Sequence, residues 1–325
     1  MTGDTEILAA SPRFPFAPSL LPRPLTALYH LRFAIYYSAG MEIVNRIPRM
    51  MSIARDLRTK GRKIGFVPTM GAIHEGHMSL MTRAREMSDI VVVSTFVDPM
   101  QFSSNDEFDK YPRDLAHDAE LAFTRGVDLI FAPVAADVYQ NGFASYVVVE
   151  GLSNKLEGSS RPEFFRGVAT VMSKLFNIVR PQFAFFSRKH AQEIVVIKRV
   201  VRDLSVDVEI VTCPTVREED GLALSSKNWL LSTEERKAAT VLRRALERCR
   251  TMYNGGERDA SRVLLAMRQI LEAEPLARID YVAITDIEHL EHLDIIPASS
   301  PTLISMAVYI GPHRLTDNIM LNGDL

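Results

Sequence analysis

The sequence predicts an α/β protein in which a doubly wound, Rossmann-like parallel sheet is followed by a smaller α+β domain. From Met41 onward, apolar segments of strand length alternate with helical patterns, as in sheets that are wound in strand–helix units. Segment 89–97 is a continuous apolar run, which indicates a strand buried on both faces of a parallel sheet. The pattern changes near Pro214, where two long amphipathic helices precede two strands. We therefore expect one domain at 41–213 and a second at 214–325, closing over the site.

The expected elements alternate in a regular order. Helices are predicted at 42–59, 77–87, 114–125, 166–179 and 190–204, and strands at 63–67, 89–97, 128–132, 146–149, 183–186 and 208–211. In the second domain, helices are predicted at 232–252 and 258–273, and strands near 279–284 and 302–309. Pro68 is expected to end the first buried strand, because proline has no N–H for the ladder. Ligands on doubly wound sheets bind beyond the carboxyl ends of the strands, so the loops after the strands form the candidate site.

Composition favours small-molecule partners. The chain has 325 residues, 47% of them hydrophobic, enough for two domains with large cores. Its formal net charge of −2 gives no general attraction to nucleic acid or to an anionic membrane, so neither is expected as a partner. Cys213 and Cys249 lie far apart without metal-ligand spacing, which indicates reduced, buried thiols and a cytoplasmic protein.

Residues 1–40 differ from the rest of the chain. Five prolines interrupt this segment, and the apolar stretch 25–37 contains His30 and Arg32, so it is too short and too polar to span a membrane. We expect a disordered extension or an upstream start, with the fold beginning at Met41 and no chemistry before it.

Two histidines arrive together where the first buried strand gives way to a helix. In the stretch 67–77, Gly71 and Gly76 bracket a tight turn, and His74 and His77 lie three residues apart. A helix start presents free N–H groups and the positive end of the dipole, which suits a phosphate. Both imidazoles can face the same ligand. The alternative is a turn with two incidental histidines.

Three further loops carry polar groups after strands. Gln101 follows the second strand, Lys189 follows strand 183–186, and Lys227 lies beside Ser225 and Ser226 after strand 208–211. Each residue alone is commonly a surface group. Two lysines and a serine pair that converge on a His-x-Gly-His turn favour a phosphate site instead. The sequence has no Walker loop and no Gly-x-Gly-x-x-Gly signature.

Six motifs occur in an order that resembles the pantothenate synthetase (pantoate–β-alanine ligase) family, over nearly the whole chain after Met41. They are Pro68-Thr69-Met70-Gly71, His74-Glu75-Gly76-His77, Phe164-Phe165-Arg166-Gly167-Val168, Pro214-Thr215-Val216-Arg217, Gly221-Leu222-Ala223-Leu224-Ser225-Ser226 and Arg314-Leu315-Thr316-Asp317-Asn318-Ile319. The family resembles the wider group of adenylate-forming nucleotidyl transferases. The resemblance implies that pantoate and ATP form a pantoyl adenylate, which β-alanine then attacks, releasing AMP and pyrophosphate in all.

The resemblance also implies roles for individual residues. It places ATP against Met70, Gly71, Ala72, Ile73, His74, Glu75, Gly76, His77, Ser187, Arg188, Lys189, His190, Val216, Leu224, Ser225, Ser226 and Lys227. It makes Gln101 and Glu193 the residues that hold pantoate and β-alanine. His74, His77 and Lys189 are the expected catalytic residues, with His77 as a proton donor that titrates near neutrality. Mg²⁺ is expected on the triphosphate without a protein metal site, and the protein is expected to be a homodimer.

The departures from the family pattern lie in the predicted site. Where the family usually has Gly-Glu-Lys-Asp-x-Gln-Gln, this chain has Ser187-Arg188-Lys189-His190-Ala191-Gln192-Glu193, and Asp98 replaces the usual asparagine. Lys227 replaces an arginine and loses its planar fork. Glu193 can accept a hydrogen bond from a hydroxyl but cannot donate one, and it is expected to repel a carboxylate.

Three hypotheses follow from the motifs and the departures. The first, which we favour, is a pantoate–β-alanine ligase with an adapted pocket. The second is an adenylate-forming ligase of the same fold that acts on another hydroxy acid or amine, as Asp98, His190 and Glu193 suggest. The third is a catalytically weak nucleotide-binding homologue. Turnover to AMP separates the third from the others, and the preferred acid separates the first two.

Overall fold

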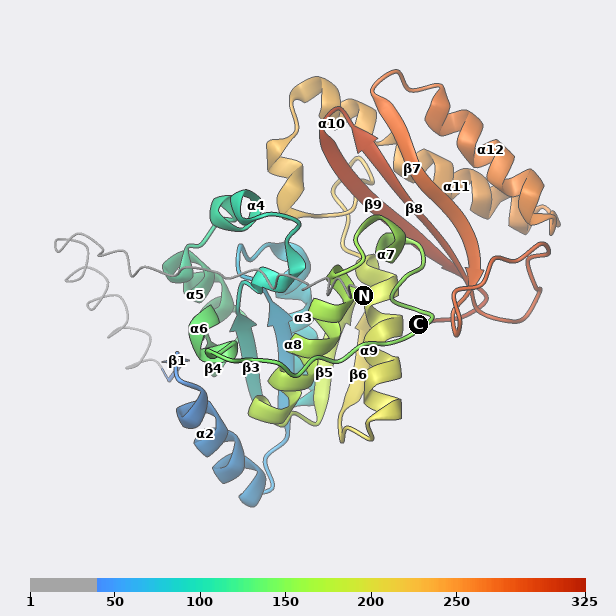
Figure 1. Cartoon of the computed structure of the whole chain (residues 1–325). Helices are drawn as coiled ribbons and strands as arrows, with labels where there is room; N and C mark the ends of the chain where they lie inside the picture. The colour runs from blue at the N-terminus through green and yellow to red at the C-terminus, as the bar shows by residue number, and fades with distance from the viewer. Residues whose placement is uncertain (1–39) are drawn as a thin grey trace, which may run out of the picture.

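The computed structural model describes residues 40–325, which build two sheets (Figure 1). The expected extension therefore lies outside the described residues, apart from Gly40. The helices are α2 (Ile47–Thr59), α3 (Glu75–Met87), α4 (Asn105–Lys110), α5 (Leu115–Thr124), α6 (Ala135–Val138), α7 (Glu157–Ser160), α8 (Phe164–Val179), α9 (Ala191–Asp203), α10 (Thr233–Ala239), α11 (Val241–Asn254) and α12 (Ala260–Glu272). Three short 3-10 helices are η1 (Pro99–Gln101), η2 (Arg188–His190) and η3 (Ser226–Leu230).

The first sheet is parallel throughout and runs in the order β1-β4-β3-β2-β5-β6. Its strands are β1 (Glu42–Val44), β2 (Ile64–Thr69), β3 (Ile90–Thr95), β4 (Leu129–Phe131), β5 (Phe183–Ser187) and β6 (Glu209–Cys213). Phe66 and Val92 pack in the cluster that contains α2, α8 and α9, whereas Val67 and Val93 pack in the cluster that contains α3 and α5. Both faces are thus buried, which confirms the doubly wound sheet that the continuous apolar runs predict.

The second sheet is antiparallel, in the order β7 (Ala277–Asp286), β8 (Thr302–Ile310) and β9 (His313–Leu321). Helices α11 and α12 pack on it and close a second apolar core, which includes Leu246, Met267 and Met306. In Figure 1 this sheet stands above the carboxyl ends of the parallel strands. The smaller α+β unit predicted from the sequence is confirmed, and it faces the strand ends where a ligand is expected.

Three predicted elements differ in the structure. Residues Glu42–Val44 form the edge strand β1, paired with β4, rather than the start of a helix. The predicted strand at 146–149 is irregular, because no strand of the described chain pairs with it. The predicted helix 232–252 is two helices, α10 and α11, which are separated at Thr240.

Pro68 does not end β2, which continues to Thr69 and pairs with β3 through Pro68 and Ser94. The ladder between β2 and β5 includes only Gly65 and Phe66. No hydrogen bond of that ladder therefore needs an N–H at Pro68. Strand β9 escaped prediction because three consecutive polar residues, 316–318, interrupt its apolar pattern. Two of them, Asp317 and Asn318, are buried and hydrogen-bonded to Arg217 and to the Lys189 carbonyl.

Candidate active site

Helix α3 begins with two stacked histidines. His74 is the N-cap, and its Nδ1 accepts a hydrogen bond from the Gly76 N–H at 3.1 Å. His77 Nδ1 accepts from the His74 N–H at 3.4 Å, and the two ring centroids lie 4.1 Å apart. Because each Nδ1 is an acceptor, the neutral rings carry their protons on Nε2. The helix start therefore offers two N–H donors on stacked rings.

The electrostatic environment keeps both rings neutral. Burial, together with Lys189 and His190, lowers the pKa of His74 to about 4. Burial and the neighbouring His74 hold the pKa of His77 well below its usual value. The expectation that His77 titrates near neutrality is wrong for this environment. Burial and the neighbouring basic groups make the protonated ring unfavourable. At pH 7 the two histidines act as hydrogen-bond donors and carry no positive charge.

Asp118, which was not among the predicted site residues, holds the loop that precedes the histidines. Its carboxylate accepts hydrogen bonds from the Ala72 N–H at 3.2 Å and from the Ile73 N–H at 2.8 Å. Gly71 has φ 79°, and a Cβ there would lie 2.8 Å from Asp118 Oδ2, so glycine is required. Asp118 could have been noticed as an acidic residue on the face of α5 that is otherwise buried and apolar, next to Ala119.

Two serine-capped turns form the opposite side of the site. Ser187 Oγ accepts from the Lys189 N–H and begins η2, and Ser225 Oγ accepts from the Lys227 N–H and begins η3, both at 3.3 Å. The side chain of Ser226 bonds Tyr111, which follows α4. Each turn places a lysine shortly after a serine cap, at the end of the sheet that also holds the histidines.

Strand β9 ties these turns to the second sheet. Asn318 Nδ2 donates to the Lys189 carbonyl at 2.8 Å, and the buried Asp317 accepts from both terminal nitrogens of Arg217 at 2.7 and 2.9 Å. The polar residues that hid this strand in the sequence therefore hold the site together. Burial lowers the pKa of Lys189, and the carboxylates of Asp317 and Glu193 act in the opposite direction.

The structure brings together most residues that were expected to contact ATP. Lys189 and His190 are close enough to His74 and His77 to lower the pKa of both. Lys227 acts electrostatically on Lys189 from the second turn. Val216 belongs to the same group of loops, since its carbonyl accepts from the Leu224 N–H at 3.0 Å. Arg188 is directed elsewhere and pairs with Asp324 at 2.7 Å.

Gln101 lies at the end of β3 and is held from two directions. Its Nε2 donates to Asp98 Oδ2 at 3.1 Å, and its backbone carbonyl accepts from Arg161 at 2.6 Å. The loop after β2 runs beside the end of β3, where Met70 and Thr95 form an isolated bridge. The loop that carries the histidines and the segment that ends in Gln101 thus leave neighbouring parallel strands at the same edge of the sheet.

Glu193 lies among basic side chains. His190 Nδ1 lies 3.0 Å from its carboxylate. Burial raises the pKa of Glu193, but His190, Lys189 and Arg161 outweigh that effect and hold the pKa below its usual value. Arg161, which the sequence analysis missed, also acts on Lys227. The negative charge of Glu193 is thus compensated locally by basic groups.

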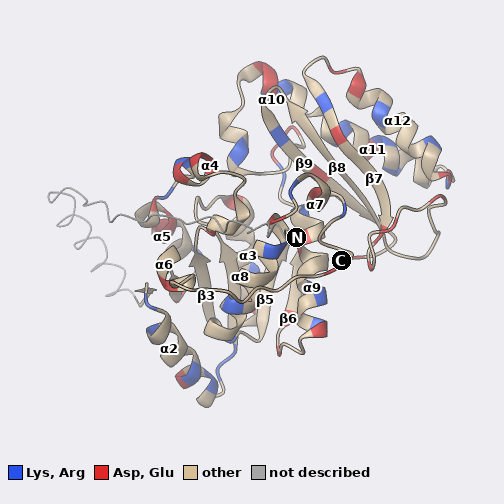
Figure 2. Cartoon of the chain, viewed as in Figure 1, with Lys and Arg blue, Asp and Glu red and all other residues tan. Residues whose placement is uncertain are grey.

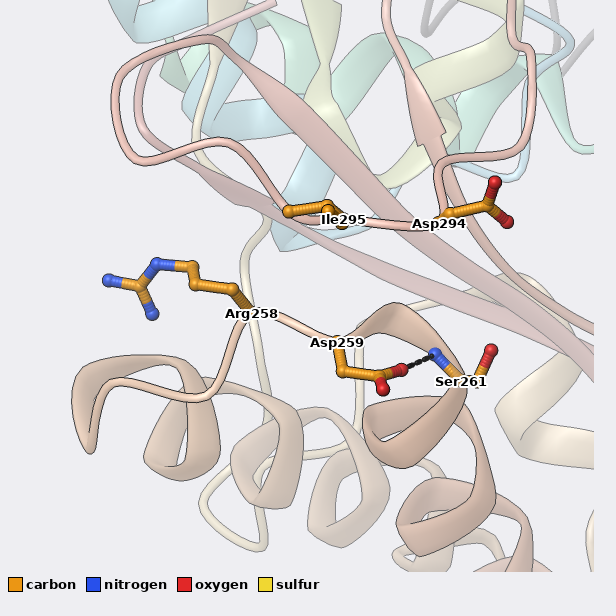
Figure 3. A pocket seen from close by; sticks show the side chains of 5 residues that line it. All are labelled: Arg258, Asp259, Ser261, Asp294 and Ile295. Atoms are coloured by element: carbon orange, nitrogen blue, oxygen red, sulfur yellow. Dashed lines mark hydrogen bonds between the residues drawn. The ribbon is translucent and has the colours of Figure 1, made fainter.

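Two hollows of the described chain lie away from these residues. One is lined by Arg258, Asp259, Ser261, Asp294 and Ile295, where Asp259 caps α12 through the Ser261 N–H at 2.9 Å (Figure 3). This bond accounts for the polar groups there as a helix cap. Positions of basic and acidic residues are coloured along the ribbon, and basic ones lie on α12 (Figure 2). Within residues 40–325, no group of three His, Cys, Asp or Glu side chains could hold a metal, and no helix is long and apolar enough to span a membrane.

The candidate site has paired N–H donors, lysines and capped serines at the carboxyl ends of a parallel sheet. This combination is typical of an α/β enzyme that binds a nucleoside triphosphate. Comparison with known proteins narrows this class. The chain belongs to the pantoate–β-alanine ligase family, whose sequence profile matches residues 42–320.

Named relatives agree with this assignment. The pantothenate synthetase of Pelotomaculum thermopropionicum is 52% identical over 86% of this chain and 99% of its own length. The crystal structure of pantothenate synthetase from Thermus thermophilus superposes with a TM-score of 0.79 at 42% identity, covering 86% of this chain and 99% of that one. The ligase of Francisella tularensis, solved with β,γ-ATP and β-alanine, gives a TM-score of 0.70 at 32% identity over 86% and 97%.

Proposed function

We propose that this protein joins pantoate to β-alanine at the expense of ATP, through a pantoyl adenylate, releasing pyrophosphate and AMP. The observation that carries the proposal is the convergence of the stacked pair His74 and His77 with the serine-capped lysines Lys189 and Lys227 in a member of this ligase family. A carboxylate is a poor acyl donor, and adenylation gives it a good leaving group. The protein must mainly position the reactants and stabilise charge on the phosphates.

In this mechanism the two sides of the site share the triphosphate. His74 and His77 donate from Nε2 to phosphate oxygens on one side, and Lys189 and Lys227 neutralise charge on the other. The pantoate carboxylate attacks the α-phosphorus and pyrophosphate leaves. The β-alanine amine then attacks the acyl carbon, and AMP leaves. The loops 70–77, 187–190 and 224–227, with Val216 at the adenine, would enclose the nucleotide.

Mg²⁺ fits this site as part of the substrate. The ion would be held mainly by phosphate oxygens and water, as is usual for Mg²⁺ on ATP. When bound, it would add positive charge that stabilises the leaving pyrophosphate. His74, His77 and the lysines would then contact the oxygens that the ion leaves free.

The direct test is AMP formation by the full chain with ATP, pantoate, β-alanine and Mg²⁺. We expect AMP and pantothenate in equal amounts, with pyrophosphate released from ATP and pantoate alone. A panel of other hydroxy acids tests the alternative ligase, which would be supported if another acid exceeded pantoate by a wide margin. Nucleotide binding without AMP from any acid would contradict both and leave the third hypothesis.

We further propose a cytoplasmic homodimer. The free cysteines Cys213 and Cys249 are buried and unpaired, which suits a reducing compartment. The extended segment 143–149 leaves Tyr146 41% and Val148 58% exposed and has no partner strand within the described chain. Native proteins cover such apolar edges, and a second copy of the chain is the cover we propose.

Light scattering at micromolar concentration tests the dimer. We expect Val148→Glu to shift the mass toward the monomer, because it buries a charge in the contact. Leu265→Glu is the matched control, since Leu265 is 59% exposed on α12, away from this segment. A dimer unchanged by the first variant, or a wild-type monomer, would contradict the proposed contact.

A further inference from the structure

Asp98 is a buried carboxylate in contact with three donors. It directly follows the second predicted strand and is 1% exposed. Its Oδ1 accepts from the Met100 N–H at 3.1 Å and from the Tyr139 hydroxyl at 2.9 Å. Its Oδ2 accepts from Gln101 Nε2 at 3.1 Å. All three donors are neutral, so the carboxylate is held by hydrogen bonds alone.

This arrangement determines the orientation of the Gln101 carboxamide. An ionised carboxylate only accepts hydrogen bonds, so the amide must turn Nε2 toward Asp98 and Oε1 away from it. The backbone of Gln101 is fixed separately, because its carbonyl accepts from Arg161 at 2.6 Å. Gln101 is only half-buried, which leaves Oε1 accessible to a ligand.

We propose that Asp98 is a positioning residue that holds Gln101 with Oε1 toward the substrates, so that this side of the pocket selects groups that donate hydrogen bonds. The inference rests on the proposed function and on the contact of Gln101 with pantoate and β-alanine that the family resemblance implies. Glu193 strengthens the same polarity, since its carboxylate is also an acceptor. Asp98 and Glu193, both departures from the family pattern, therefore both favour ligand groups that donate hydrogen bonds.

The two substrates respond differently to this polarity. The ammonium group of β-alanine can only donate, whereas each hydroxyl of pantoate can donate or accept. Reversing the Gln101 amide would turn an N–H toward the ammonium group and would leave pantoate a usable contact. The KM for β-alanine is therefore the sensitive quantity.

The variant Asp98→Asn reverses the amide. Its Oδ1 accepts from Met100 and Tyr139, so its Nδ2 faces Gln101 and favours Oε1 as partner. At pH 8 we expect the KM for β-alanine to rise about 10-fold, which corresponds to one hydrogen bond of ordinary strength. The KM for pantoate and the rate of pyrophosphate release without β-alanine should change by less than about 3-fold, within the range of a weaker contact.

The exchanged pair is the decisive variant. When Asp98→Asn is combined with Gln101→Glu, the asparagine donates to one oxygen of the introduced carboxylate, and the other oxygen again faces the substrate as an acceptor. We expect this double variant to recover a KM for β-alanine near that of the wild type. Gln101→Glu alone should fail, since two carboxylates would face each other. Asp56→Asn, a change on the exposed face of α2, is the control.

Each outcome decides the proposal. An unchanged KM for β-alanine in Asp98→Asn, or equal losses for both substrates, would overturn it. If Asp98→Asn alone does not fold, the double variant must still exceed Gln101→Glu in activity, and failure to do so would also overturn it. Absence of AMP from the wild type is a different result, which would contradict the proposed function instead.

Discussion

The nucleotide side and the acid side of the site are held in different ways. On the nucleotide side, local backbone geometry fixes each group: His74 caps its own helix, and Ser187 and Ser225 cap the turns that carry the lysines. On the acid side, side chains fix one another, as Asp98 does with Gln101 and His190 with Glu193. Local geometry resists substitution one residue at a time, whereas paired side chains can be exchanged together. The departures from the family pattern occur on both sides, and those on the acid side, Asp98 and Glu193, each contact a neighbouring side chain.

The largest expected effect is on the nucleotide side. His77→Ala removes one of the two Nε2 donors, and we expect pyrophosphate release at saturating substrates to fall about 10²–10³-fold, as for loss of one preorganised donor. His289→Ala is the control, because that side chain is 63% exposed. A decrease of less than about 10-fold, with unchanged thermal unfolding, would contradict the prediction that single substitutions on the nucleotide side have the largest effect.

The next effect concerns the free energy of unfolding and tests the acid side. Burial raises the pKa of Asp98 from 3.8 to about 6. A raised folded-state pKa favours folding below the unfolded pKa, and this contribution is lost as the pH rises through the folded pKa. A shift of about two units corresponds to ~3 kcal/mol.

Asp98→Asn should therefore gain stability relative to the wild type as the pH rises from 4 to 7. Urea unfolding of both proteins at pH 4 and pH 7 measures this difference, in which the other carboxylates cancel. Asp56→Asn, on the exposed face of α2, is the control for removing a surface carboxylate. A constant difference for Asp98→Asn would show that the carboxylate is not strained by its burial.

A smaller effect is expected at the loop that precedes the histidines. Asp118→Ala leaves the buried Ile73 N–H and the Ala72 N–H without their acceptor, which costs ~2 kcal/mol of unfolding free energy. Because the loop loses its shape, the KM for ATP should rise while the KM for β-alanine changes little. Asp118→Asn keeps one acceptor and should fall between Asp118→Ala and the wild type. Equal changes in both KM values would mean that Asp118 supports the two sides alike.

The same difference explains which parts of the fold and of the site could be predicted from the sequence. The parallel sheet and the His-x-Gly-His turn were predictable because they depend on local patterns. Asp118 and Arg161 were missed because their partners lie far away in the sequence, 45 or 46 and 60 positions from them. Strand β9 was missed because Asp317 and Asn318 are buried by hydrogen bonds to Arg217 and to the Lys189 carbonyl rather than in an apolar core. Glu193 was expected to repel a carboxylate. Its basic neighbours Lys189 and His190 are close to it in the sequence, whereas Arg161 is brought to it only by the fold.

The smallest expected effect tests whether His190 and Glu193 are a coupled exchange. His190→Asp places a second carboxylate beside Glu193, and Glu193→Gln leaves His190 without its partner, so each should lower kcat/KM for pantoate. The double variant should lose less than the sum, with a coupling energy of ~1 kcal/mol, as for contacting charged residues. The side chains are 49% and 27% exposed, so added salt should weaken the coupling. Strictly additive losses would show that the two departures are independent and that the acid side, like the nucleotide side, is built one residue at a time.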